Sequence, residues 1–147
     1  MGKRVIVVGG GIAGMQTALK LSAGGVSALL LERDADLGGK LTGWHKLFPS
    51  FTPAHEVLDE LRRRLAASDV EVRTRCEVAE VARDGVMLST GERLEADAVV
   101  VATGFTLFDA RIKEEYGYGI YDNVYTTVDI ERMLNEGRVA LKDGTAP

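Results

Sequence analysis

Residues 4–14 read Arg4-Val5-Ile6-Val7-Val8-Gly9-Gly10-Gly11-Ile12-Ala13-Gly14, and this stretch decides the fold. The continuous β-branched run at 5–8 is typical of a parallel strand that is buried on both faces. A helical pattern follows, and the pair at 24–25 ends it, as glycine at the C-terminal side of a helix commonly does. Residues 26–32 then predict a second strand. Together these segments indicate a β-α-β unit of about thirty residues, with parallel strands and a right-handed crossover.

The rest of the chain extends this unit and adds a second, smaller sheet. The patterns predict an irregular segment at 41–53, an amphipathic helix at 55–67 and a third strand at 70–72. Three short strands separated by turn dipeptides follow at 77–82, 85–89 and 93–95. A fully buried fourth parallel strand is expected at 98–101, and a late helix at about 128–134. The expected fold class is α/β: a Rossmann-like parallel sheet flanked by helices, with a small antiparallel β-meander on its other side. The expected strand order is 3-2-1, with the 98–101 strand next to strand 1.

Composition excludes several classes of function. A chain of 147 residues with a net charge of −4 is one domain by length and is unsuited to nucleic acid, which requires a surplus of positive charge. No apolar run approaches the roughly 18 residues of a membrane span, and no signal peptide precedes the first strand. A single cysteine, Cys76, rules out an internal disulfide and any cysteine-ligated cluster or zinc within one chain. We therefore expect a cytoplasmic protein without membrane insertion.

The glycine spacing predicts a dinucleotide site. Gly9, Gly11 and Gly14 follow a strand and open a helix, where a tight turn, close approach of a diphosphate and close helix–strand packing each require glycine. The helix N-terminus then offers free N–H groups and a positive dipole end to the diphosphate.

A carboxylate completes the adenosine half of this pattern. Glu32 lies eighteen residues after Gly14, at the end of the second strand, where it is expected to accept the ribose hydroxyls and to repel the extra phosphate of NADP. The alternative is a strand-end carboxylate that merely faces water.

Two further motifs favour FAD over NAD as the cofactor. Gly38-Gly39 resembles the double glycine of the glutathione-reductase-like flavoprotein superfamily, and the run from Gly91 through Ala102-Thr103-Gly104 resembles its second signature. The resemblance implies that Gly38, Gly39 and Gly104 let the backbone approach FAD, and that Val78 makes a backbone contact to adenine. The other residues that we assign to the cofactor adjoin these motifs: Ile12, Ala13, Arg33, Lys40, Ala102 and Thr103.

The later part of the chain narrows the resemblance. Glu114-Glu115-Tyr116-Gly117-Tyr118-Gly119 and Glu131-Arg132-Met133-Leu134 are similar to the A subunits of heterodisulfide reductases and to the related quinone-interacting membrane-bound oxidoreductase subunits. The similarity covers essentially the whole chain and the N-terminal portion of such proteins. It implies an FAD-binding part of an electron-transferring flavin oxidoreductase, with iron–sulfur or quinone-linked partner proteins. A dinucleotide-binding module without activity of its own, or an NAD-binding domain, remains the alternative.

The chain departs from these families in two respects. No Cys-x-x-x-x-Cys follows Gly38-Gly39, so a dithiol reductase mechanism is excluded. The superfamily also continues with an NAD-binding insertion and a returning Gly-Asp segment. We therefore expect residues 1–137 to form an FAD-binding domain that is incomplete relative to the family, followed by a linker at 138–147, and we expect the chain alone to be inactive.

Other residue types have a structural and a functional interpretation. Cys76 is expected to be a small buried residue rather than a redox group. His45 and His55 have no carboxylate or cysteine at metal-ligand spacing, so a metal site is not expected there. The segment 62–64 is expected to be a solvated arginine face rather than a surface for an acidic partner. Trp44 and Phe48 can pack the core or line the route to the flavin ring, and the tyrosines at 116–125 can pack a loop or stack on it. No catalytic side chain is assigned, since the cofactor itself would carry the chemistry.

Overall fold

The computed structural model describes residues 2–146. Its strands, in chain order, are β1 (Arg4–Val8), β2 (Ser27–Leu31), β3 (Lys46–Leu47), β4 (Thr52–Pro53), β5 (Glu71–Arg73), β6 (Val78–Ala82), β7 (Gly85–Leu88), β8 (Arg93–Glu95) and β9 (Ala98–Val101). The helices are α1 (Ile12–Ala23), α2 (Ala54–Ala66) and α3 (Thr127–Asn135), and the short 3₁₀ turns are η1 (Gly39–Gly43), η2 (Ala110–Ile112) and η3 (Glu114–Tyr116).

A parallel sheet forms the centre of the molecule. Its strand order is β5-β2-β1-β9, and all three pairings are parallel. In the shared register Val7 lies between Leu30 of β2 and Val100 of β9. The predicted order, 3-2-1 with the last strand next to strand 1, is therefore confirmed.

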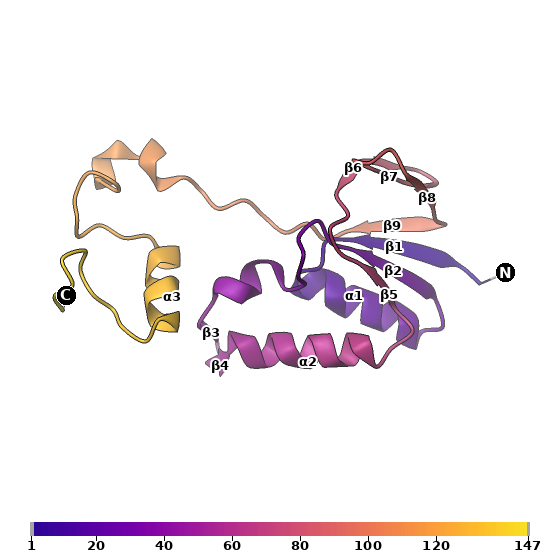
Figure 1. Cartoon of the computed structure of the whole chain (residues 1–147), viewed down its shortest axis with the longest axis horizontal. Coiled ribbons are helices and arrows are strands. Elements are labelled where there is room, and N and C mark those ends of the chain that lie inside the picture. The colour runs from indigo at the N-terminus through magenta and orange to yellow at the C-terminus, as the bar shows by residue number, and fades with distance from the viewer. Residues whose placement is uncertain (1, 147) are drawn as a thin grey trace.

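Each face of this sheet buries its own set of side chains, because successive residues of a strand point to opposite sides. Toward the helices, Val7 and Leu30 pack with Met15 of α1 and with Leu58 and Leu61 of α2. Figure 1 shows α1 and α2 side by side on this face, with the β6-β7-β8 meander over the other. The predicted layers are thus confirmed.

The meander covers the second face. Ile6 and Leu29 of the parallel sheet pack against Val86, Leu88 and Leu94 of the meander, and all five are buried. The meander is antiparallel throughout, as the turn dipeptides between its strands predict.

Two details of the sequence interpretation are wrong. The strand β9 is not fully buried: among the described residues it pairs only with β1, and Val101 is 60% exposed. The segment 41–53 is not irregular throughout, since it contains the end of η1 and the hairpin of β3 and β4. The hairpin strands have two residues each, too few for an alternating pattern to be recognised.

The chain leaves the sheet after β9 and returns as α3. Figure 1 shows the segment running away from the sheet, with α3 lying near η1 and β3. The backbone N–H of His45 donates to the Glu131 carboxylate at 2.6 Å, and the Asn135 amide donates to the carbonyl of Gly43 at 2.9 Å. These bonds attach α3 to the segment that follows the double glycine. Among residues 2–146, no helix combines the length and apolar character needed to cross a bilayer.

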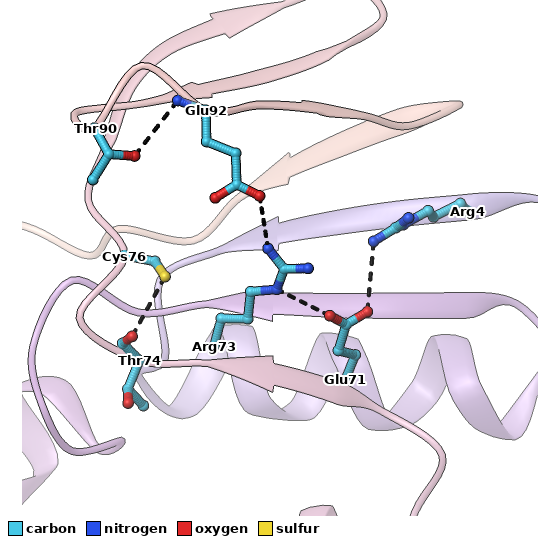
Figure 2. A network of polar contacts seen from close by, with 7 residues as sticks. All are labelled: Arg4, Glu71, Arg73, Thr74, Cys76, Thr90 and Glu92. Atoms are coloured by element: carbon cyan, nitrogen blue, oxygen red, sulfur yellow. Dashed lines mark hydrogen bonds and ion pairs between the residues drawn. The ribbon is translucent and has the colours of Figure 1, made fainter.

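An ion-pair network fastens the meander to the parallel sheet (Figure 2). Arg4 of β1 pairs with Glu71 of β5 at 3.5 Å, and Arg73 pairs with Glu71 at 3.0 Å and with Glu92 at 3.1 Å. Hydrogen bonds from Arg73 to Glu71 and Glu92 raise the pKa of this guanidinium above its usual value. Since Glu92 belongs to the turn between β7 and β8, the network joins both sheets at an exposed edge.

Candidate functional site

The glycines of the fingerprint have distinct surroundings. A β-carbon on Gly9, whose φ is +108°, would lie 2.5 Å from the carbonyl oxygen of Ala102. One on Gly14 would collide with the carbonyl oxygen of Gly9, so this glycine allows α1 to pack closely on the loop. One on Gly11 would meet no atom within 4 Å. The first and third glycines are thus required by the protein's own packing, whereas the second borders open space.

That open space lies at the N-terminus of α1. Gly11 is the N-cap residue, so no side chain caps the helix, and its first turn contains no acidic residue. The first N–H groups of a helix have no partner within it and carry the positive end of its dipole. An uncapped helix of twelve residues whose cap is a glycine facing a cavity therefore suits a phosphate group.

Glu32 is buried at the end of β2, with 6% of its surface exposed. One carboxylate oxygen accepts the N–H of Gly10 at 2.6 Å, and the other accepts the N–H of Asp34 at 2.8 Å. The alternative of a carboxylate that merely faces water is wrong, because Glu32 is buried and joins the glycine loop to the turn after β2. A carboxylate offers about four acceptor positions, so these bonds leave room for ligand hydroxyls.

The double glycine stands opposite the fingerprint. The N–H of Gly38 donates to the carbonyl of Gly10 at 2.9 Å, and Gly38 forms an isolated bridge with Gly11. A β-carbon on Gly39 would lie 3.3 Å from the α-carbon of Gly11. Two glycine motifs that are distant in sequence therefore form adjoining backbone walls.

The third wall follows β9. The N–H of Ala102 donates to the carbonyl of Val8 at 2.8 Å, which continues the sheet pairing into the Ala-Thr-Gly segment. Beyond it, the ammonium of Lys40 lies 4.6 Å from the ring centre of Phe105, a cation–π contact that links η1 to this segment.

These walls enclose a pocket of about 480 Å³, within the usual range for small-molecule sites. Every residue that the sequence assigned to the cofactor lines it except Gly14, which packs beneath it: Gly9, Gly11, Ile12, Ala13, Glu32, Arg33, Gly38, Gly39, Lys40, Val78, Ala102, Thr103 and Gly104. The lining also includes residues that the sequence did not assign, among them Asp34, Trp44, Cys76, Glu77 and Phe105. Most of these adjoin assigned residues, and proximity to a motif was the one available signal.

The remaining candidates divide between the pocket and the surface. Trp44 lines the pocket and also packs against the core, so the expected core packing is confirmed and the place beside the flavin ring stays a prediction. Phe48 does neither, being 87% exposed. None of the tyrosines at 116–125 lines the pocket. Cys76 is half-buried in the pocket wall, and its thiol donates to the carbonyl of Thr74 (Figure 2).

The arginine segment of α2 is not a uniform solvated face. Arg62 is half-buried and donates to the carbonyl of Leu37, so the interpretation of 62–64 as solvated is wrong for its first member. In the part of the chain that the structure describes, no group of three or more histidine, cysteine or acidic side chains is arranged to hold a metal ion.

Comparison with known proteins finds similarity to dinucleotide-binding and flavin-containing families, as expected for a pocket of this kind. Residues 7–60 match the family model of an NAD(P)-binding Rossmann-like domain, and residues 48–113 match that of the flavin containing amine oxidoreductases. A CoB–CoM heterodisulfide reductase iron–sulfur A subunit from Methanopyrus kandleri is 51% identical over 61 residues, which are 37% of this chain and 9% of that protein. The chain is similar in sequence to the heterodisulfide reductase A subunits. Together these matches indicate a flavin cofactor.

A second relative, from Methanococcus maripaludis, is similar over the same extent. This A subunit of an H₂/formate-dependent heterodisulfide and ferredoxin reductase is 45% identical over 60 residues, again 37% of this chain and 9% of the relative. The heterodisulfide reductase relatives that match are thus far longer than the stretch they share with this chain.

Solved structures share the fold. The tetrameric form of 2-methyl-3-hydroxypyridine-5-carboxylic acid oxygenase matches with a TM-score of 0.55 and 21% identity, over 67% of this chain and 38% of the other. The ferredoxin reductase of the CYP199A2 system from Rhodopseudomonas palustris matches with a TM-score of 0.50 and 22% identity, over 78% and 27%. The α/β class expected from the sequence is therefore confirmed.

Proposed function

We propose that the pocket binds FAD through its adenosine diphosphate half. The diphosphate lies between the N-terminus of α1 and the double glycine, where Gly11 and Gly39 have no side chain to keep it from the backbone. The remaining acceptor positions of Glu32 take the ribose hydroxyls, and Val78 contacts the adenine through its backbone. Lys40 and Arg33, both in the pocket lining, supply positive charge near the phosphates.

One observation carries this proposal: the glycine loop, Glu32, the double glycine and the Ala-Thr-Gly segment all face one pocket. These four motifs are spread over residues 9–104, and the parallel sheet brings them to the carboxyl ends of β1, β2 and β9, where ligands of such sheets bind. When bound, the flavin accepts and releases electrons. The protein groups hold and orient the cofactor, and no side chain is required as an acid or base.

We further propose that this chain is the FAD-binding part of an oxidoreductase. That oxidoreductase would transfer electrons between a donor and iron–sulfur or quinone-linked partner proteins in the cytoplasm. Support comes from relatives described as iron–sulfur subunits of heterodisulfide reductase and as parts of ferredoxin-dependent reductases. The absence of a redox cysteine pair after Gly39 is consistent with electron transfer through the flavin.

The proposal is tested by calorimetric titration of the chain with FAD, ADP, FMN and NAD, with Gly11→Val as a control that fills the diphosphate site. Binding of FAD and ADP but not FMN, abolished in the Gly11 variant, is the expected result. Tighter binding of NAD than of FAD would favour the alternative of an NAD-binding domain. If FAD binds more than a hundredfold tighter than ADP, about 2.7 kcal/mol comes from the flavin end, and the assignment of affinity to the ADP half is wrong.

A further inference from the structure

We propose that Arg62 is a positioning residue of the cofactor site, which holds the double-glycine loop in the conformation that receives the diphosphate. This inference rests on the proposed dinucleotide function. Arg62 does not line the pocket. It acts from α2, through the main chain of the segment that carries Gly38.

Arg62 differs from its two neighbours on the same helix. Arg63 is exposed and pairs with Glu60 at 2.7 Å, and Arg64 is exposed. Arg62 is half-buried, and its guanidinium donates to the carbonyl of Leu37. A hydrogen bond from an ionised donor is roughly twice as strong as a neutral one. The helix thus directs a single charged donor at the residue that precedes the double glycine.

The loop that Arg62 contacts is otherwise attached at its two ends. Residues 33–36, between β2 and Leu37, are exposed and lie outside helices and strands. At its start the N–H of Asp34 donates to Glu32, and the carbonyl of Asp34 accepts the N–H of Arg75 at 2.9 Å. At its end the side chain of Leu37 packs against the core, and the N–H of Gly38 donates to Gly10. Arg62 binds the same end from the opposite side. Leu37 and Gly38 are therefore held between the glycine loop and α2.

The double glycine makes this attachment consequential. Gly38 and Gly39 adopt φ values of +137° and +52°, and glycine at such positions has many alternative conformations once it is released. Only the conformation that places Gly39 opposite Gly11 leaves the diphosphate space formed. If the competent conformation is populated for only a fraction of the time, the apparent affinity falls by that fraction.

The test compares Arg62→Met, Arg62→Lys and Arg64→Met in the full chain. The methionine at 62 keeps an apolar stem but removes the donor, the lysine restores a charged donor, and the change at 64 is the matched control on the same helix. We expect Arg62→Met to weaken ADP binding roughly tenfold, or about 1.4 kcal/mol. The lysine variant should recover part of this loss, and Arg64→Met should bind as the unaltered chain does.

Hydrogen exchange of peptides spanning 33–41, without ligand, separates positioning from general destabilisation. Arg62→Met should accelerate exchange there and leave β1 and β2 unchanged. The inference is overturned if a folded Arg62→Met binds ADP within twofold of the unaltered chain, or if exchange rises uniformly. If the unaltered chain does not bind ADP, the proposed function fails, whereas the exchange result still reports on the Arg62 contact.

Should Arg62→Met not fold, Arg62→Lys is compared with Arg64→Lys. Here the charge is kept, and only the planar fork of the guanidinium is lost. A loss of roughly threefold at 62 and none at 64 is expected for the same reason of loop population. Equal affinities would overturn the inference.

Discussion

Gly11 and Gly14 belong to one motif but respond differently to substitution. Because Gly11 borders open space at an ordinary φ of −73°, Gly11→Val should fold normally and abolish ADP binding. Because a side chain on Gly14 would collide with the Gly9 carbonyl, Gly14→Ala should lower the free energy of unfolding by roughly 1–3 kcal/mol, the scale of overpacking. Urea unfolding and calorimetric titration of both variants check this. Binding retained in a folded Gly11→Val chain would remove the fingerprint from the site.

The proposed site gives Glu32 two separable roles. Glu32→Ala leaves the N–H of the buried Gly10 without its acceptor, so unfolding should become easier by about 1–3 kcal/mol. The same variant should also lose discrimination between AMP and adenosine 2′,5′-bisphosphate, since the carboxylate no longer repels the second phosphate. Denaturant unfolding measures the first effect and calorimetry the second. Unchanged discrimination in the folded variant would show that Glu32 serves only the loop.

Candidate cofactor residues near the glycine motifs could be identified from the spacing of the glycines alone, because that spacing determines which backbone atoms a ligand can reach. Arg62 and Gly10 could not. Gly10 occupies a variable position of the motif, yet Leu37 and Glu32 would both lie within 3 Å of a β-carbon there. Both residues matter through contacts with the loop at 33–38, and the path of that loop depends on how α2 packs.

Among the elements, the strand order was predictable from the sequence, whereas the partial exposure of the edge strand β9 was not. The run at 98–101 has three β-branched residues and the run at 5–8 has four, so both predict buried strands. Yet within residues 2–146 β1 lies between two neighbouring strands, whereas β9 pairs with one. Both runs have the composition of a buried strand, so composition alone does not show that the strand at the end of the predicted order is partly exposed.

The start of α3 is stabilised by a capping box that depends on pH. Burial opposes ionisation of Asp129, but hydrogen bonds from the hydroxyl and N–H of Thr126, together with Tyr118 and the charge of Arg132, outweigh it and lower the pKa of this carboxyl. A carboxyl whose pKa is lower in the folded state stabilises fully above its unfolded pKa of about 3.9 and loses this contribution as pH falls through the folded value.

Thr126→Ala should therefore destabilise α3 at neutral pH by about 0.5–2 kcal/mol, with a smaller difference near pH 3. Hydrogen exchange of peptides spanning 127–135, measured for both chains at the two pH values, checks this. Asp129→Asn is the control, since its exchange should lack this pH dependence. An equal effect of Thr126→Ala at both pH values would contradict the role of the ionised carboxylate.

At the scale of the whole molecule, the network of Arg4, Glu71, Arg73 and Glu92 joins the meander to the parallel sheet. These side chains are partly or largely exposed, so dissolved salt screens them, with a Debye length of about 3 Å at 1 M salt and about 30 Å at 0.01 M. Arg73→Gln should lower the melting temperature at low salt and have little effect at 1 M. Thermal unfolding at both salt concentrations measures this, and an effect independent of salt would indicate packing of the arginine stem instead.

The exposed edge of β9 bears on how the chain behaves in concentrated solution. A strand that lacks a neighbour presents unpaired N–H and C=O groups, and Val101 adds an exposed apolar side chain to them. Such an edge is a template for self-association, so purified chain should form aggregates as its concentration rises. Val101→Lys places a charge on the edge without touching the core and should raise the concentration at which light scattering appears. For crystallisation and for calorimetric titration, the lysine variant is therefore the better starting material.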